Sequence, residues 1–445
     1  MHDKQSASRL STAKTVTDLT SKLHIPAQDK KSWRRWVWLF WALLGPGLLA
    51  MLGDNDAGGV IAYAVTGAQF GIGFFVPLLF CLAPLTFTIQ EMSMRLGVVT
   101  QTGFSKLVFR QYGRFWGFYH ITTLALENLL TLVTEFIGMT AGLVMLGLPL
   151  WASDGICLTL TVSFVLFTGY WTKERLALFI GAANLVFLVA AWMTQPSMAT
   201  IVRAFQTWNL PSVPGPGGDL IWYILATIGN AVAPWMIFFQ SSAVIDKGMT
   251  PEDLNLGRID TALGSLMQTI VAMGVMICGA ALFGHVQDIG DTGPSTMIRS
   301  LYDVAGRWPA ILLGIGLFNA GFLAAITISL SSSWTIAEAF GWLKSLNDRL
   351  STAPKFYAVY IGSILCASLA ILIPDLPLNF ISVVTQVIGG ILMAPILIFL
   401  VLMTSNKKLM GNYKNGLVGS LWGWIMVTLL IALTAATFWK TLISL

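Results

Sequence analysis

Residues 45–59 read Gly-Pro-Gly-Leu-Leu-Ala-Met-Leu-Gly-Asp-Asn-Asp-Ala-Gly-Gly and lie inside a long apolar segment, residues 36–68. Two carboxylates and an amide stand in this segment, where each charge costs roughly 3 kcal/mol on membrane-insertion scales. The glycines beside them allow the backbone to leave the helix and expose its carbonyl groups. Acidic side chains together with free carbonyls indicate a site for a hard cation. The alternative is a kinked helix in which Asp54 and Asp56 cap a half-helix.

The composition of the whole chain points to a lipid environment. Of 445 residues, 56% are hydrophobic and only 11% are charged, whereas a soluble domain normally carries about 25% charged residues. A chain this apolar needs the bilayer as its solvent. We expect helices and not a β-barrel, because the apolar runs are about 20 residues or longer and do not alternate.

Eleven apolar segments follow one another along the chain, and several exceed the roughly 20 residues that a span requires. They cover residues 36–68, 70–95, 115–147, 150–170, 175–195, 220–246, 259–286, 308–342, 355–374, 377–404 and 416–443. With the N-terminus in the cytoplasm, all 26 Lys and Arg residues fall on the cytoplasmic side except Arg203, Arg299, Arg307 and Lys440. The positive-inside rule therefore predicts a multi-pass plasma (inner) membrane protein with a cytoplasmic N-terminus and an extracellular C-terminus.

The eleven segments divide into two groups. Residues 1–35 are polar and predict a disordered cytoplasmic tail, followed by a first repeat of five spans, 36–205. Residues 206–219 contain Pro-Ser-Val-Pro-Gly-Pro-Gly-Gly and predict an external linker. A second repeat of five spans, 220–405, precedes a loop and an eleventh span, 406–445. The first span of each repeat is interrupted at mid-membrane depth, which is typical of inverted-repeat transporters with the binding site at the breaks.

The sixth span repeats the pattern of the first. Pro234 removes a backbone donor and leaves the carbonyls of residues 229–231 without helical partners. Asn230 adds a side-chain oxygen at the same place, although an ordinary proline kink is the alternative. In the tenth span Gln386 is a further candidate, but a glutamine inside a span often does no more than bond a neighbouring helix.

Two glutamates mark the third span. Glu127 and Glu135 are eight residues apart, a little over two helical turns, so both lie near one face of the helix. No Lys or Arg falls in the middle of a span to pair with them. Either both are protonated or they line a water-filled path for a cation, and we predict the ion path.

The motifs around these residues resemble the natural resistance-associated macrophage protein (NRAMP) family of divalent-metal transporters. In the first span, Gly-Pro-Gly at 45–47 leads to Asp-Ala-Gly-Gly at 56–59, where the family usually has Asp-Pro-Gly-Asn. Thr-Glu-Phe-Ile-Gly at 134–138 is similar to the family's Ala-Glu-Val-Ile-Gly, and residues 229–241 align without gaps with Gly-Ala-Thr-Val-Met-Pro-His-Asn-Leu-Tyr-Leu-His-Ser. The resemblance implies an all-α LeuT-like fold with two inverted five-helix repeats and an eleventh helix, working by alternating access.

The departures from the family pattern concern the metal. The family's metal-binding Met falls at Ala233, the Asn of its first span at Gly59, and its two histidines at Trp235 and Gln240. A thioether selects soft transition metals, whereas Mg²⁺ requires oxygen ligands and gives up its water reluctantly. The pattern is similar to the prokaryotic NRAMP-related magnesium transporters, which the resemblance implies move Mg²⁺ and also Mn²⁺ without obligatory proton coupling.

We therefore predict a monomer in the lipid bilayer that imports Mg²⁺, and also Mn²⁺, as its transported ions. The predicted metal site has Asp56 as its main ligand and comprises Asp56, Asn230, Gln386, Asp54, Gly53, Gly59 and Ala233, with carbonyls near Gly53 and Asn230. The main alternative is a proton-coupled Mn²⁺/Fe²⁺ importer. A channel is a further alternative that one sequence does not test. The paired aspartates disfavour an amino-acid or Na⁺ symporter. The sequence has no motif that would indicate an enzyme. The net charge of +5 does not indicate nucleic-acid binding, because the basic residues follow the topology.

Overall fold

The computed structural model describes residues 45–167, 170–210, 220–286, 290, 292–343 and 350–444, and every regular element in these ranges is helical. The first span consists of two helices, α3 (Pro46–Asp54) and α4 (Ala57–Phe70), separated at Asn55 and Asp56. The predicted interruption of this span is therefore confirmed.

The remaining helices divide into long and short ones. The long helices and their partners across interruptions are α5 (Phe75–Thr100), α7 (Arg114–Met145), α8 (Leu150–Phe167), α9 (Tyr170–Ala183), α10 (Val186–Met193), α12 (Leu220–Ala231), α13 (Pro234–Asp246), α14 (Leu254–Ala280), α16 (Arg307–Phe340), α17 (Pro354–Ile371), α18 (Leu378–Ser405) and α20 (Leu417–Ser444). The short ones are α6 (Phe104–Tyr112), α11 (Met198–Thr207), α15 (Pro294–Ala305), α19 (Lys407–Met410) and the 3₁₀ turns η1 (Pro251–Asp253) and η3 (Gly411–Tyr413).

Nine helical stretches in the described residues are long and apolar enough to cross a membrane by length and composition. The interrupted pair α3 and α4 and the shorter apolar helix α8 occupy the two further positions at which the sequence predicts spans. The polar tail, residues 1–35, and the proline-rich stretch, residues 211–218, lie outside the described residues. The division into two repeats and the sidedness of the termini stay predictions.

Two features differ from the expected pattern. The fifth span, expected to be continuous over 175–195, is interrupted between α9 and α10 at Asn184 and Leu185. The helix α11 extends into the stretch 206–219 that was expected to be linker. A ring contact between Phe205 and Phe80, with centroids 5.7 Å apart, helps to hold α11 on α5. The sequence predictions rest on apolar runs of about 20 residues. Helices of two or three turns, such as α10 and α11, are too short to be recognised in this way.

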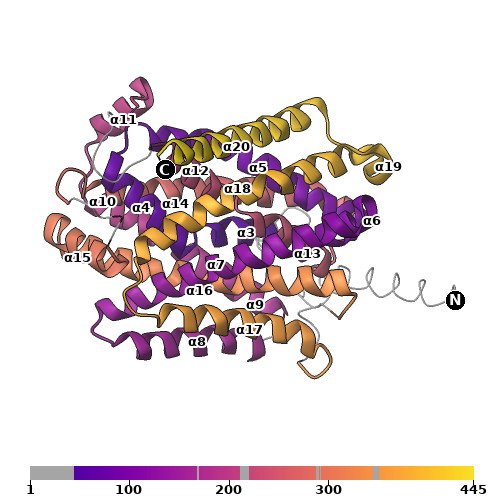
Figure 1. The fold of residues 1–445 in the computed structure, drawn as a ribbon, viewed down its shortest axis with the longest axis horizontal. Helices are drawn as coiled ribbons and strands as arrows, with labels where there is room; N and C mark the ends of the chain where they lie inside the picture. The colour runs from indigo at the N-terminus through magenta and orange to yellow at the C-terminus, as the bar shows by residue number, and fades with distance from the viewer. Residues whose placement is uncertain are drawn as a thin grey trace, which may run out of the picture.

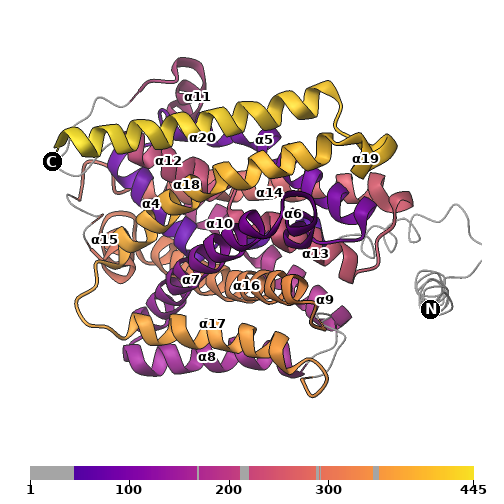
Figure 2. The ribbon, with the colours of Figure 1, turned by 45° about the vertical axis from the view of Figure 1, so that its right-hand side comes forward.

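The interrupted helices lie inside the bundle. Figures 1 and 2 show α8 and α17 side by side on one flank and α18 and α20 on the opposite flank, with α3, α4 and α13 between them. Nearly every residue of α3 and α4 is buried, whereas α20 is largely exposed. Irregular backbone at membrane depth is tolerated only where protein or water covers it. The position of these breaks inside the bundle therefore allows their polar groups to bond other parts of the protein or an ion.

Candidate metal site

The break in the first span brings two carboxylates to the start of α4. Asp56 is the N-cap residue, and its Oδ1 accepts a hydrogen bond of 2.5 Å from the N–H of Gly59. Glu135 of α7 reaches the same turn, and its Oε2 accepts a bond of 2.7 Å from the N–H of Ala57. Capping is thus part of what Asp56 does. A carboxylate has about four lone-pair positions, so a single cap leaves capacity for a cation.

Asp54 lies at the opposite side of this break and is joined to the break in the sixth span. Gln268 of α14 donates from Nε2 to Asp54 Oδ2 and to the carbonyl of Ala231, the latter at 3.1 Å. The backbone carbonyl of Gln268 accepts from Asn55 Nδ2 at 3.2 Å. Gln268 therefore bridges both breaks. It is not among the residues predicted from the sequence, although a glutamine inside an apolar span is a recognisable signal of a polar contact between helices.

The break in the sixth span is confirmed, with α12 ending at Ala231 and α13 beginning at Pro234. Ala233 has extended backbone, with φ of −77° and ψ of 144°, and serves as the N-cap of α13. The carbonyl of Ala231 lacks a helical partner as predicted, but Gln268 and Thr86 Oγ1 (3.2 Å) both donate to it. This carbonyl is therefore used to hold the two breaks together.

Gly59 and Asn230 share one space. A Cβ atom built on Gly59 would collide with Asn230 Oδ1, so any other residue at this position requires the Asn230 side chain to move. A Cβ atom on the neighbouring Gly58 would lie 3.1 Å from Gln386 Nε2. Asn230 and Gln386 are thus brought to the first turn of α4 beside Asp56.

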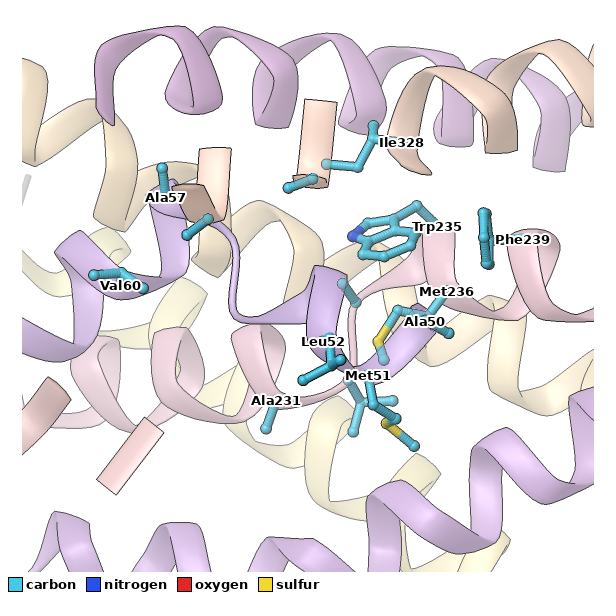
Figure 3. Close-up of a cluster of buried hydrophobic side chains, with 14 of the residues drawn as sticks. Ala50, Met51, Leu52, Ala57, Val60, Ala231, Trp235, Met236, Phe239 and Ile328 are labelled. Atoms are coloured by element: carbon cyan, nitrogen blue, oxygen red, sulfur yellow. The ribbon is translucent and has the colours of Figure 1, made fainter. Parts of the chain in front are cut away.

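Gly53 and Trp235 form the other wall of the break. A Cβ atom on Gly53 would lie 2.9 Å from Thr327 Oγ1 and 3.2 Å from the Trp235 ring. Figure 3 shows Trp235, the second residue of α13, beside the segment that runs from Leu52 in α3 to Ala57 in α4. The Trp235 side chain is fully buried, so this indole closes the site on the side of α16.

Polar oxygen atoms without hydrogen-bond partners gather around the two breaks. In the described part of the chain, the buried oxygens that lack a partner include Asp54 Oδ1, Asn55 Oδ1, Glu127 Oε2 and Gln268 Oε1. Buried polar groups normally find partners, and a cluster of free oxygens is a suitable environment for a hard cation.

Four acidic side chains at the site have no basic partner among the described residues. Asp54, Asp56, Glu127 and Glu135 are each at most 3% exposed, and a negative charge on Asp56 would disfavour a charge on each of the other three. No ion pair of the described residues involves any of the four. Within the part of the chain that the structure describes, no group of three His, Cys, Asp or Glu side chains is close enough to hold a metal ion. A bound cation would therefore need amide and carbonyl oxygens beside one or two carboxylates.

A small cavity of about 40 Å³ lies between α3, α8, α9, α13 and α16. Thr327, which touches Gly53, lies at its wall, as do the apolar residues Leu49, Phe239 and Leu330. Neither Glu127 nor Glu135 lines this cavity, so the ion path predicted through them stays a prediction. Glu174 also lines the cavity and forms a buried ion pair of 2.9 Å with Lys247.

The first turn of α3, which walls this cavity, is held by Asp260. The carboxylate accepts from the N–H groups of Gly45 (3.0 Å) and Gly47 (2.8 Å). Asp260→Ala would leave these buried donors without a partner, at about 1–3 kcal/mol for each group. We expect a fall in melting temperature of several degrees in detergent. Asp303→Ala, at an exposed position of α15, is the control. An Asp260→Ala protein as stable as this control would contradict the expectation.

The comparisons with known proteins decide the family. A family model described as natural resistance-associated macrophage protein-like (Nramp) matches residues 47–440. The chain belongs to the Nramp family. It is 28% identical to the divalent metal cation transporter MntH of Levilactobacillus brevis, covering 96% of this chain and 94% of that protein. Against the MntH of Aeromonas hydrophila the identity is 24%, covering 88% and 94%.

Solved structures show that this Nramp protein has the LeuT-like fold. A manganese transporter of Eremococcus coleocola, in the crystal structure of a mutant form, superposes with a TM-score of 0.73 at 21% identity, covering 89% of this chain and 87% of that one. The structure of MhsT in complex with L-phenylalanine superposes with a TM-score of 0.54 at 15% identity, covering 87% and 98%. The predicted all-helical, polytopic, LeuT-like fold is confirmed, and the family is one of transporters and not of enzymes.

Proposed function

We propose that this Nramp protein carries divalent metal ions across the membrane by alternating access, with the ion held between the breaks of the first and sixth spans. The observation that carries the proposal is the set of unpartnered oxygens and unpaired carboxylates described above. Asp56 would contribute the main charge, and Asp54, Asn230 and Gln386 would contribute oxygens directly or through water. The relatives are named as divalent metal cation and manganese transporters, which supports the same class of cargo.

Within this class we propose Mg²⁺ as the preferred ion, with Mn²⁺ also carried. Ala233 stands where the family pattern has a thioether, so the position offers no soft ligand that would favour Mn²⁺ or Fe²⁺. The amide and carboxylate oxygens match the hard ligands that Mg²⁺ prefers. The relatives' names favour manganese, and a proton-coupled Mn²⁺/Fe²⁺ importer is therefore the second candidate.

We propose further that transport does not require a proton. Trp235 and Gln240 stand where the family pattern has histidines, and neither side chain titrates near neutral pH. Gln240 Nε2 instead donates to Thr261 Oγ1 at 2.9 Å, a bond that holds α13 to α14. The membrane potential and the gradient of the ion would then drive uptake.

The test is uptake by purified protein in liposomes that contain a Mg²⁺ dye or a pH dye. Entry of Mg²⁺ without acidification, absent from protein-free liposomes, is the expected result. Entry of Mn²⁺ together with protons, while Mg²⁺ is excluded, would establish the second candidate. If neither ion enters when a membrane potential is imposed, the proposal of divalent metal transport is wrong.

A further inference from the structure

The interruption of the fifth span changes its hydrogen-bond pattern. The N–H groups of Asn184 and Leu185 donate to carbonyls three residues earlier, those of Gly181 (3.0 Å) and Ala182 (3.1 Å). Such 3₁₀-type bonds inside a long helix often mark a functional position. Because the N–H of Asn184 bonds Gly181, the carbonyl of Ile180 loses the partner that a regular helix would give it.

Two asparagine side chains donate hydrogen bonds to carbonyls that the interruptions leave without helical partners. Asn319 of α16 donates from Nδ2 to the carbonyl of Ile180 at 2.8 Å and to Asn184 Oδ1 at 2.5 Å. Asn184 in turn donates from Nδ2 to the carbonyl of Leu52 at 3.2 Å. Leu52 lies in the last turn of α3, where carbonyls have no helical partner. A continuous chain of hydrogen bonds therefore runs from α16 to the end of α3.

We infer that Asn184 and Asn319 are positioning residues for the metal site. They fix the last turn of α3, and Gly53 and Asp54 follow Leu52 directly. Asn184 is fully buried, and its turn packs tightly on α3, because a Cβ atom on Gly181 would lie 2.7 Å from Leu52 Cδ1. Because Asn184 occupies the Leu52 carbonyl, the carbonyls of Gly53 and Asp54 would be the ones left for the ion. This inference rests on the proposed function.

The test compares the apparent KM and the maximal rate of Mg²⁺ and Mn²⁺ uptake in liposomes for Asn184→Ala and Asn319→Ala. Loss of one buried hydrogen bond that leaves a carbonyl unpaired should raise KM by about tenfold. The maximal rate should stay within about twofold of the wild type, because neither side chain carries the ion. The double variant should raise KM no more than the stronger single variant, since both act through one chain of bonds.

Ser368→Ala is the matched control. Ser368 of α17 donates to Asp154 Oδ2 of α8 at 2.7 Å, a buried interhelical bond at the flank of the bundle. Its removal should leave KM unchanged. A lower melting temperature of the asparagine variants with wild-type KM would show a purely structural role and overturn the inference. If Asn184→Ala does not fold, Asn319→Ala, whose side chain is only partly buried, carries the same expectation alone.

Failure of the proposed function gives a different result. Wild-type uptake of either ion tests that function, whereas the ratio of KM between variant and wild type tests the inference. A wild-type protein that carries Mn²⁺ and excludes Mg²⁺ would correct the proposed selectivity and leave the KM comparison intact.

Discussion

Replacing Asp56 by Ala is expected to reduce metal uptake at least about 100-fold, equivalent to roughly 3 kcal/mol of lost ion binding. The carboxylate is the main charge proposed for the ion, and no ion pair among the described residues engages it, so its charge is available to a cation. The same substitution also removes the N-cap of α4, which costs about 1 kcal/mol of stability.

Asp56→Asn separates these two contributions. Asparagine caps a helix about as well as aspartate, so the bond to the Gly59 N–H is retained while the charge is lost. We expect Asp56→Asn to melt close to the wild type and yet to lose most uptake. Uptake by Asp56→Asn at the wild-type rate would show that Asp56 is a cap alone and would remove it from the proposed site.

Replacing Gly59 by Ala is expected to abolish uptake and lower the melting temperature, because the new methyl group meets the Asn230 amide. Overpacking of this kind typically costs about 1–3 kcal/mol. Asn230→Ala in the same protein should remove the collision, so that Gly59→Ala/Asn230→Ala is more stable than Gly59→Ala. A double-mutant cycle should give a coupling energy of at least about 1 kcal/mol.

An exchange variant then tests the role of the amide itself. Gly59→Asn/Asn230→Ala places an amide on α4 in the arrangement that the family pattern has. We expect this variant to recover uptake beyond that of Gly59→Ala/Asn230→Ala, measured with Mg²⁺ and Mn²⁺ separately. Additive effects of the single substitutions, or an exchange variant as inactive as Gly59→Ala, would show that the two positions do not share one space.

The sequence alone determined the spans and two of the three interruptions found in the described residues. Charged residues inside apolar segments are costly, and Gly53, Gly58 and Pro234 act on the backbone at their own positions. Such effects are local, so they can be predicted without a structure. The candidates at these breaks, from Asp54 and Asp56 to Asn230, do lie together around them, although their role as ligands stays a prediction.

Only the tertiary structure decided which groups meet across the bundle. Gln268 reaches Asp54 across 214 positions of sequence, and Asn184 reaches Leu52 across 132. Each reads in the sequence as one polar residue inside an apolar span, with nothing to indicate its partner. The steric conflict between a side chain at position 59 and Asn230 likewise depends on the packing of α4 against α12 and cannot be predicted from the sequence. Hydrogen bonding and steric exclusion act over a few ångströms, and the packing of the helices sets those distances.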